Sequence, residues 1–206
     1  MLTTTPHSPA STRLRVVIVG AGYVATHHLA ALKQLDFVDV VGICDNQLAA
    51  AQALAARFGV PRSATSLAEL ADAQPQAVYV LTPPAFHAAI ALQAMEMGCH
   101  VLVEKPMADT VADCESMIAA ARLRKLQLGV NHSDLFDPVV MQALQAVRDG
   151  RIGDVVSVEI VRNSEYPPYA GGPLPGSVTQ GSYPFRDLGV HGLYTIEAFL
   201  GPVRDL

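Results

Sequence analysis

The sequence predicts an α/β fold, in which a doubly wound parallel sheet is followed by an incomplete α+β second domain. Strand-like and helix-like segments alternate from residue 14 to about residue 130. The strand-like segments are short, continuous runs of Val, Ile, Leu and Ala, which is typical of parallel strands buried on both faces. After residue 130 this alternation ends, and prolines and glycines accumulate. These three observations separate the chain into two parts.

The alternating segments define the expected elements of the first domain, residues 14–130. Expected strands cover residues 14–20, 38–45, 77–82, 100–106 and 126–130. Expected helices cover residues 23–35, 46–59, 66–71, 85–97 and 110–124. In the second of these helices, Asn46 is the expected cap and Gly59 the expected stop.

The second part, residues 131–206, reads as the start of another domain. It has an expected helix at 138–149, an alternating strand at 154–163, a Pro- and Gly-rich loop at 164–184 and a helix at 185–200. The first 13 residues are rich in Thr, Ser and Pro and lack the apolar core of a secretory signal, so they are expected to form a flexible tail.

Composition excludes several classes of function. Hydrophobic residues make up 50% of the 206 residues and charged residues 16%, which is typical of a folded core. The net charge is −5 and no basic stripe is present, so we expect no nucleic-acid partner. No apolar run is long enough to cross a bilayer, so we expect no membrane partner either.

The cysteines indicate the compartment. Cys44, Cys99 and Cys114 are odd in number and show no C-x-x-C spacing. Free thiols in a reducing cytoplasm explain them better than a disulfide or a metal site does. We therefore expect a cytoplasmic protein without a bound metal.

A glycine-rich turn joins the first expected strand to the first expected helix. It consists of Gly20, Ala21, Gly22, Tyr23, Val24 and Ala25, which fit the pattern G-x-G-x-x-(G/A). In this context Gly20 permits the tight turn, Gly22 lets the backbone approach a pyrophosphate, and Ala25 allows close contact of helix and strand. Phosphates would bind at the helix N-terminus, where free N–H groups and the helix dipole favour negative charge. The first domain is therefore predicted to be a Rossmann domain.

Asp45, at the end of the second expected strand, indicates the type of dinucleotide. It lies near the usual offset for the acidic residue that binds the ribose hydroxyls. A carboxylate there repels a 2′-phosphate, and no Arg is adjacent, so NAD is favoured over NADP. Separately, the glycines fit an ordinary turn and Asp45 fits a helix cap. Together, in this order of elements, they favour a cofactor site.

Three further clusters carry polar side chains of the types that bind ligands or take part in catalysis. They are LTPPAFH at residues 81–87, EKP at 104–106 and DLGVH at 187–191. The first two lie at the C-terminal ends of expected strands, at the edge where open parallel sheets place their ligands.

With these motifs the sequence resembles the Gfo/Idh/MocA oxidoreductases, the group that includes glucose–fructose oxidoreductase and inositol dehydrogenase. The resemblance lies in the ordered set GAGYVA, CD, TPPAFH, EKP and DLGVH, and it covers nearly the whole chain from residue 14. The combination of EKP with D-x-G-x-H at this distance is its most specific part.

The resemblance implies an NAD(P)-dependent enzyme that moves a hydride between the nicotinamide and a secondary alcohol or ketone of a sugar, cyclitol or related polyol. It implies that Lys105 reaches the substrate and that Asp187 and His191 are the catalytic Asp and His. A spacing of four places the latter two on one helical face. His191 would take the hydroxyl proton, and Lys105 would polarise the oxygen.

The resemblance further implies cofactor contacts and a cis bond before Pro106. The expected cofactor-binding residues are Gly20, Gly22, Tyr23, Val24, Ala25, Asp45, Thr82, Pro83, His87, Glu104 and Lys105. The residues also fit plainer roles: Lys105 as a solvated strand-end lysine, Asp187 and His191 as a surface pair, and His87 as a helix-start residue. His28 is expected to be structural, and Asn131 and His132 are expected to line the cleft.

The second domain departs from the family pattern. Family members carry a large, mostly antiparallel sheet that covers the cofactor and forms the oligomer interface, whereas only the strand at 154–163 is expected here. The chain is therefore interpreted as a C-terminally truncated member: a fragment, a short form that pairs with another chain, or a degenerate product. We expect a homo-oligomer, or association through the incomplete sheet. The alternative function is a non-catalytic dinucleotide-binding or interaction module, in which Asp187 and His191 are idle.

Overall fold

A computed structural model describes residues 13–162 and 185–205. The chain divides into two compact units, Met1–Asn131 and His132–Leu206. Each unit is described by itself. Of the expected tail only Arg13 falls within the described residues, and the Pro- and Gly-rich loop at 164–184 lies outside them.

The first unit is built on a six-stranded parallel sheet with the order β3-β2-β1-β4-β5-β6. Its strands are β1 (Leu14–Val19), β2 (Val38–Cys44), β3 (Ser63–Ala64), β4 (Ala77–Val80), β5 (His100–Val103) and β6 (Leu128–Val130). The chain runs outward in one direction from β1 to β3 and in the other from β4 to β6. The strand order therefore reverses between β1 and β4, which is where ligands bind to sheets of this type. The predicted doubly wound sheet is confirmed.

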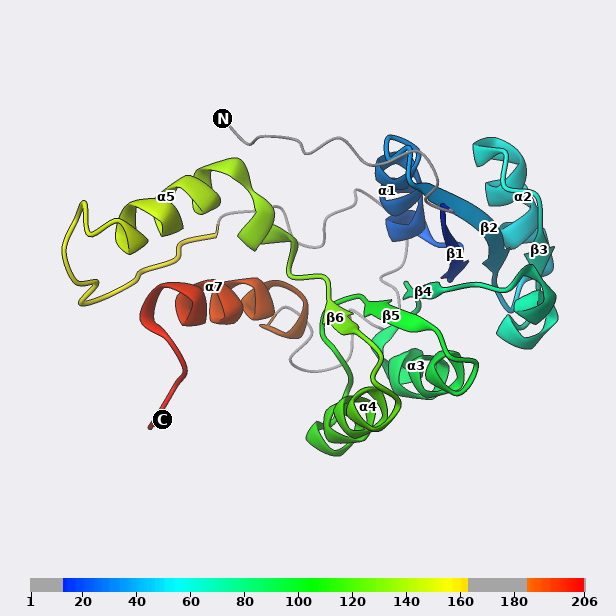
Figure 1. Ribbon diagram of the computed structural model, residues 1–206. Coiled ribbons are helices and arrows are strands. Elements are labelled where there is room, and N and C mark those ends of the chain that lie inside the picture. The colour runs from blue at the N-terminus through cyan, green and yellow to red at the C-terminus, as the bar shows by residue number, and fades with distance from the viewer. Residues whose placement is uncertain (1–12, 163–184, 206) are drawn as a thin grey trace, which may run out of the picture. The chain divides into compact units, whose positions relative to one another are not determined.

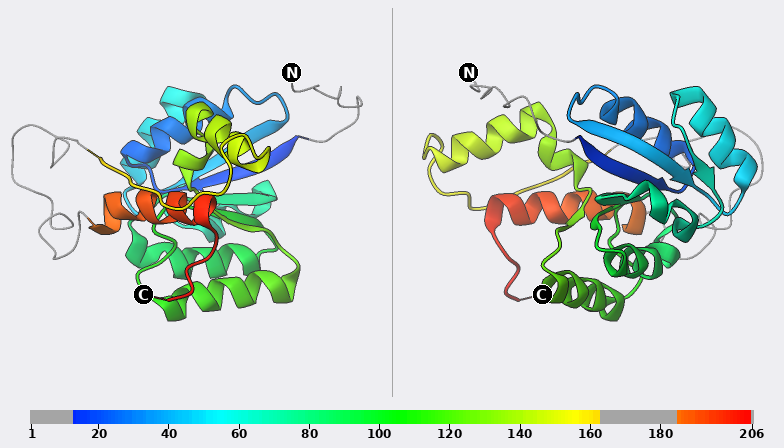
Figure 2. Two further views of the ribbon diagram at one scale, coloured as in Figure 1. Left: turned by 90° about the vertical axis from the view of Figure 1, so that its left-hand side faces the viewer. Right: turned by 45° about the vertical axis from the view of Figure 1, so that its right-hand side comes forward.

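Helices cover both faces of this sheet. They are α1 (Tyr23–Leu32), α2 (Leu48–Phe58), η1 (Leu67–Ala73), η2 (Pro84–Phe86), α3 (His87–Glu96) and α4 (Val111–Arg124). Helices α1 and α2 lie on one side of the strands and α3 and α4 on the other (Figures 1 and 2).

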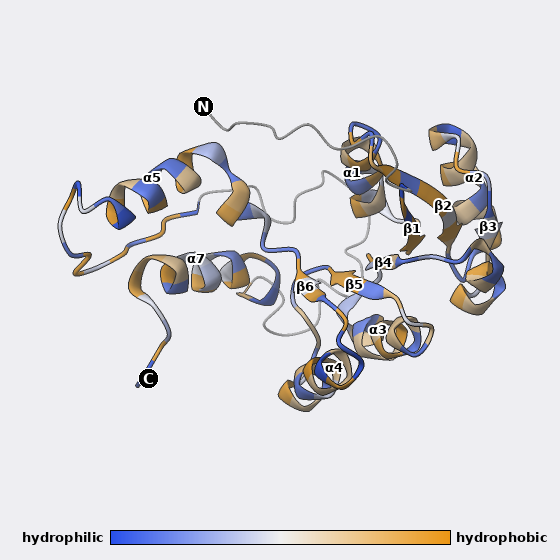
Figure 3. Ribbon diagram, in the orientation of Figure 1, coloured by the Kyte–Doolittle hydropathy of each residue, from blue (hydrophilic) through white to orange (hydrophobic). Residues whose placement is uncertain are grey.

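The continuous apolar runs follow from this layering. Successive residues of β1 point to opposite faces: Val16 and Ile18 pack with α1 and α2, whereas Val17 and Val19 pack with α3 and α4. All four side chains are buried, so no polar residue is tolerated at any of these positions. Figure 3 shows the resulting hydrophobic strands at the centre of the unit.

The helix ends expected from the sequence agree with the structure at some positions and differ at others. Gly59 ends α2 in the left-handed conformation, with φ of +62°, as its position after the helix predicts. The expected cap Asn46 is wrong, because the cap position is occupied by Gln47, whose side chain makes no capping hydrogen bond. The segment expected as a helix at 66–71 is the 3-10 helix η1, and the two-residue strand β3 was not expected.

The second unit contains η3 (Ser133–Phe136), α5 (Pro138–Arg148), the π-helical turn η4 (Phe185–Gly189) and α7 (Val190–Leu200). Asp137 caps α5 by accepting a hydrogen bond of 2.8 Å from the Val139 N–H. The expected strand at 154–163 is wrong as far as the described residues show: residues 154–162 form no ladder with them, and Val156 is 92% exposed. An alternating pattern becomes a strand only where a neighbouring strand offers hydrogen-bond partners.

The three cysteines are free; Cys44 and Cys99 are buried and Cys114 is half-buried. Burial, followed by the nearby charges of Asp45 and Glu69, raises the pKa of the Cys44 thiol to about 11. This thiol is therefore protonated and unreactive at neutral pH. Among the described helices, none has both the length and the apolar character needed to cross a membrane.

Candidate functional site

A cleft of about 630 Å³ opens in the first unit at the carboxyl ends of β1, β2 and β4. Five of the predicted cofactor-binding residues line it: Gly20, Gly22, Asp45, Thr82 and Pro83. They follow three different strands, and the parallel sheet brings them to one edge. The cleft thus occupies the position at which the strand order reverses.

The two glycines of the turn serve different purposes. Gly20 has φ of +104°, and a Cβ there would lie 2.7 Å from the Leu81 carbonyl oxygen, so the fold itself requires glycine. A Cβ on Gly22 would meet nothing within 4 Å. The expected steric need for glycine at residue 22 therefore does not come from the described protein atoms. It would arise only from a ligand that approaches the turn.

The start of α1 adjoins the cleft through Gly22, whereas Tyr23, Val24 and Ala25 are not among the described residues that line it. Tyr23 is 79% exposed and Val24 39% exposed, whereas Ala25 is fully buried beneath them. Gly22 stands at the N-cap of α1 without a side-chain hydrogen bond to the first turn. The Ala25 N–H donates a hydrogen bond of 3.1 Å to the Gly22 carbonyl oxygen. The N–H groups of Tyr23 and Val24 have no side-chain cap and point to an anion site at this helix end.

Asp45 links the two sides of the cleft. Its Oδ2 atom accepts a hydrogen bond of 2.7 Å from the Ala21 N–H, and its Oδ1 atom accepts one of 2.9 Å from the Gln47 N–H. Each carboxylate oxygen can accept more than one hydrogen bond. The side chain therefore retains capacity for a hydroxyl group while it holds the glycine turn.

Thr82 contributes an unusual polar atom. Its Oγ1 is buried and has no hydrogen-bond partner within the described residues. Buried polar groups are nearly always paired, so an unpaired one beside a cleft indicates a partner that binds there.

His87 is fully buried and joins the segments that follow β4 and β5. Its Nε2 atom lies 2.7 Å from the Thr82 carbonyl oxygen, and its Nδ1 atom lies 3.0 Å from that of Pro106 and 3.3 Å from that of Met107. In this structure the ring holds two loops together. Its predicted contact with the cofactor stays a prediction.

The EKP motif forms a corner after β5. The Lys105–Pro106 bond is cis, as the resemblance implies. The Oε1 atom of Glu104 accepts hydrogen bonds from Asn131 Nδ2 at 2.6 Å and from His28 Nε2 at 2.9 Å, and its Oε2 atom accepts one from the Lys105 N–H at 3.1 Å. Burial alone would raise the pKa of Glu104, but the hydrogen bonds from His28, Asn131 and Lys105 outweigh it and lower the pKa.

Sequence reasoning missed the part that His28 plays in this corner. The residue was expected to be structural, and its partner Glu104 lies 76 positions away in the chain. The available signal was its place on α1 directly before the buried Leu29, because a ring nitrogen close to a core needs a partner.

In the second unit, the predicted catalytic pair lies in two elements. Asp187 is in the π-helical turn η4 and His191 is in the first turn of α7, so the expected single helix at 185–200 is divided. The Nδ1 atom of His191 contacts the Tyr194 hydroxyl and lies 3.2 Å from Asp134 Oδ1. Asp134 also pairs with Arg162. Neither Asp134 nor Tyr194 was expected at this site.

His132 packs against the same group. Its ring stacks on that of Tyr194, with centroids 4.1 Å apart and the planes 14° from parallel. Burial lowers the pKa of His132, against a smaller opposing effect of the Glu197 charge. The second unit thus gathers His191, His132, Tyr194 and Asp134 into one cluster.

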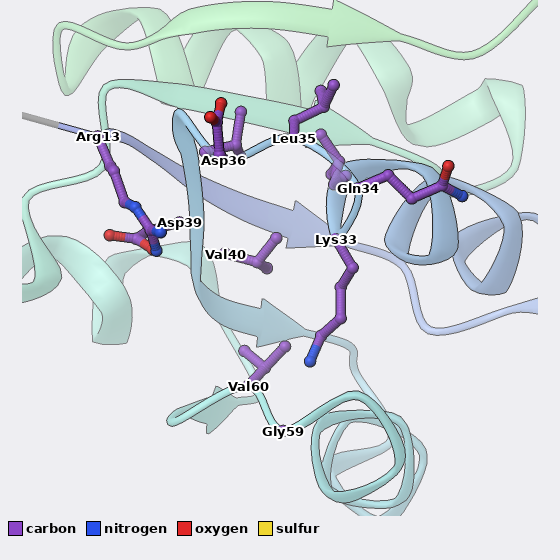
Figure 4. A pocket seen from close by; sticks show the side chains of 11 residues that line it. Arg13, Lys33, Gln34, Leu35, Asp36, Asp39, Val40, Gly59 and Val60 are labelled. Atoms are coloured by element: carbon purple, nitrogen blue, oxygen red, sulfur yellow. The ribbon is translucent and has the colours of Figure 1, made fainter. Parts of the chain in front are cut away.

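A second hollow, of about 440 Å³, lies at the amino ends of β1 and β2 (Figure 4). Arg13 and Asp39 form an ion pair of 2.8 Å at its edge, with both side chains about half exposed. Exposed pairs of this kind contribute about 0–1 kcal/mol. Parallel sheets bind ligands at their carboxyl ends, so this hollow is not the candidate site.

Comparison with known proteins gives one family. Residues 14–132, more than half of the chain, match the family described as an oxidoreductase family with an NAD-binding Rossmann fold. Over 195 residues the chain is 32% identical to D-glucoside 3-dehydrogenase of Escherichia coli (strain K12), a match that covers 93% of this chain and 55% of that protein. The chain spans about half the length of the curated relatives that it matches.

Solved structures agree with this match. A protein of gentamicin A biosynthesis in complex with NAD has a TM-score of 0.78 and 28% identity, covering 97% of this chain and 57% of that one. A 3-ketoreductase from Actinomadura kijaniata in complex with NADP has a TM-score of 0.63 and 31% identity, and the match covers 69% of this chain and 46% of that one.

Proposed function

The chain belongs to the Gfo/Idh/MocA oxidoreductase family, and we propose that it carries the cofactor site and catalytic residues of a polyol dehydrogenase or ketoreductase. The reaction transfers a hydride between a nicotinamide cofactor and a secondary alcohol or ketone of a sugar, cyclitol or related polyol. The observation that carries the proposal is the cleft that joins Gly20, Gly22, Asp45 and Thr82 at the reversal of strand order. Relatives named as D-glucoside, anhydrofructose and inositol oxidoreductases support the substrate class.

The residues of the cleft fit a dinucleotide. The N-terminus of α1 offers N–H groups without a side-chain cap to the pyrophosphate, and the open space at Gly22 admits it. Asp45 accepts hydrogen bonds from the ribose hydroxyls, and the Thr82 hydroxyl gains a partner. When bound, the cofactor supplies or accepts the hydride.

We propose NAD rather than NADP as the preferred cofactor. A 2′-phosphate would meet the carboxylate of Asp45, and the two residues that follow it, Asn46 and Gln47, are uncharged. The described lining of the cleft contains no Arg or Lys that would compensate a phosphate.

The chain's own residues would stabilise the charge on the substrate oxygen and accept its proton. Lys105 donates a hydrogen bond to the oxygen and stabilises the negative charge that develops on it. Asp134 lies 3.2 Å from Nδ1 of His191, which favours the tautomer with its proton on Nδ1 and leaves Nε2 free to take the hydroxyl proton. Asp187 orients His191 or holds a further substrate hydroxyl.

Two measurements on the purified chain test the proposal: calorimetric titration with NAD, and NADH absorbance across a panel of sugars and cyclitols. Lys105→Ala should abolish turnover and leave NAD affinity within about twofold of the wild type, because the lysine acts on the substrate oxygen. Lys33→Ala, which removes a lysine from the other end of the sheet, is the matched control. Full activity of Lys105→Ala would overturn the mechanism, and NAD binding without turnover across the panel would favour the non-catalytic module.

A further inference from the structure

The Glu104 carboxylate is a junction of three parts of the first unit. One donor, His28, comes from α1; a second, Asn131, follows β6; the third is the backbone N–H of Lys105. Both side-chain donors converge on Oε1, which leaves Oε2 for Lys105. All of these contacts lie within the first unit.

Burying the Glu104 carboxylate at this junction costs free energy. Glu104 is 9% exposed, and the side chains of Glu104 and of its hydrogen-bond partner His28 are each little more than a tenth exposed. A buried carboxylate is costly unless its oxygens are fully hydrogen-bonded, and an apolar cluster would often stabilise a fold equally well. The polar junction therefore calls for a role other than stability alone.

Its position indicates that role. The Oε2 atom of Glu104 holds the N–H of the next residue, so it fixes the backbone from which the Lys105 side chain departs. His28 is itself supported by the ring of Tyr79 on β4, which meets it edge-on with centroids 5.7 Å apart. One donor thus stands on helix α1, and the other follows directly after strand β6.

We propose that His28 and Asn131 are positioning residues for Lys105, and that they act through the Glu104 carboxylate. This inference rests on the proposed function, in which Lys105 contacts the substrate oxygen. Catalytic groups must be held to within about 0.5 Å, and a misplacement of about 1 Å costs roughly 100-fold in rate. Loss of either donor frees the Glu104 carboxylate, and the Lys105 backbone then samples other conformations.

The first test measures backbone order at Lys105 and needs no substrate. Amide hydrogen exchange of the Lys105 N–H is followed by NMR in the full chain. In His28→Leu and in Asn131→Leu, the Lys105 amide should exchange about tenfold faster than in the wild type. Each variant removes one hydrogen bond to the Glu104 carboxylate, which then holds the Lys105 N–H less firmly. His28→Gln, whose amide keeps a donor near the position of Nε2, should retain slow exchange.

The chain provides a matched control in the neighbouring histidine. His27 is exposed on the same helix and contacts Tyr23, not Glu104. His27→Leu should therefore leave the exchange of the Lys105 amide unchanged. Equal exchange in wild type and in a folded His28→Leu variant would overturn the proposal. If His28→Leu does not fold, Asn131→Leu and His28→Gln decide the same question.

The second test uses turnover. His28→Leu and Asn131→Leu should lower kcat about 10- to 100-fold with the KM for NAD within about twofold, and His28→Gln should recover most of kcat. A merely structural role would lower the melting temperature without this split and without the rescue. If the wild type turns over no substrate, the proposed function fails, and the exchange measurement still decides the positioning role. If the wild type is active and kcat is unchanged in both variants, the positioning role fails alone.

Discussion

The Oδ2 atom of Asp45 accepts a hydrogen bond of 2.7 Å from the backbone N–H of Ala21, in the middle of the glycine turn. The residue that is expected to bind the ribose therefore also holds the turn that is expected to bind the pyrophosphate. A single carboxylate at the end of β2 couples the two halves of the candidate cofactor site.

Two substitutions separate these roles of Asp45. Asp45→Asn keeps one oxygen that can accept from the Ala21 N–H, loses the acceptor for the exposed Gln47 N–H and removes the charge. It should therefore lower the melting temperature only slightly and bring the affinities for NAD and NADP closer together. Asp45→Ala loses the hydrogen bonds as well and should weaken NAD binding about tenfold, with a cost of about 1 kcal/mol in stability. Titration calorimetry with both cofactors is the measurement. An unchanged ratio of the two affinities in Asp45→Asn would contradict the assignment.

The two glycines of the turn allow a paired prediction. Gly20→Ala places a methyl group 2.7 Å from the Leu81 carbonyl oxygen at a φ of +104°, so it should destabilise the fold by at least about 1–3 kcal/mol. Gly22→Ala meets no described atom within 4 Å and has φ of −77°, so stability should be retained while NAD affinity falls. Urea denaturation and calorimetry on both variants are required. Strong NAD binding by a stable Gly22→Ala variant would show that the pyrophosphate does not approach this turn.

The sheet and its turn were predictable because their signals are local. Val16, Val17, Ile18 and Val19 are all apolar since each faces one of two cores, and the glycine pattern follows directly in the chain. Strand β3 was missed because two residues give no periodic pattern. It pairs with the end of β2, and its Ala64 side chain is buried in the core.

Contacts between distant segments could not be read from the sequence. Glu104 was expected to contact the cofactor, but its partners His28 and Asn131 lie 76 and 27 positions away and meet it only after the sheet has formed. Asp134 and His191 are likewise brought together by tertiary structure. The expected pairing of Asp187 with His191 used the repeat of a regular α-helix, whereas a π-helical turn precedes α7.

The lowered pKa of Glu104 predicts how stability depends on pH. Since the folded-state pKa lies below the ordinary value of 4.5, the ionised carboxylate stabilises the fold fully above that value, and the stabilisation is lost as the pH falls through the folded pKa. The free energy of unfolding should therefore differ most between wild type and Glu104→Gln near neutral pH, and the difference should shrink below about pH 4.5. Urea denaturation between pH 7 and pH 3 measures it. Glu96→Gln, at an exposed site on α3, should show no such trend, and a constant difference for Glu104→Gln would refute the cause assigned here.

The unpaired hydroxyl of Thr82 predicts a separation of stability from binding. Thr82→Val replaces a buried group that lacks a described partner by a methyl of similar size, so the fold should keep its stability or gain about 1 kcal/mol. If the hydroxyl bonds to the cofactor, the same change should weaken NAD binding about tenfold, whereas Thr82→Ser, which keeps the hydroxyl and loses a methyl group, should bind normally despite a small loss of stability. Thermal denaturation with and without NAD reports both effects at once. A Thr82→Val variant that is clearly destabilised and still binds NAD normally would mean that the hydroxyl has its partner within the protein and not in a ligand.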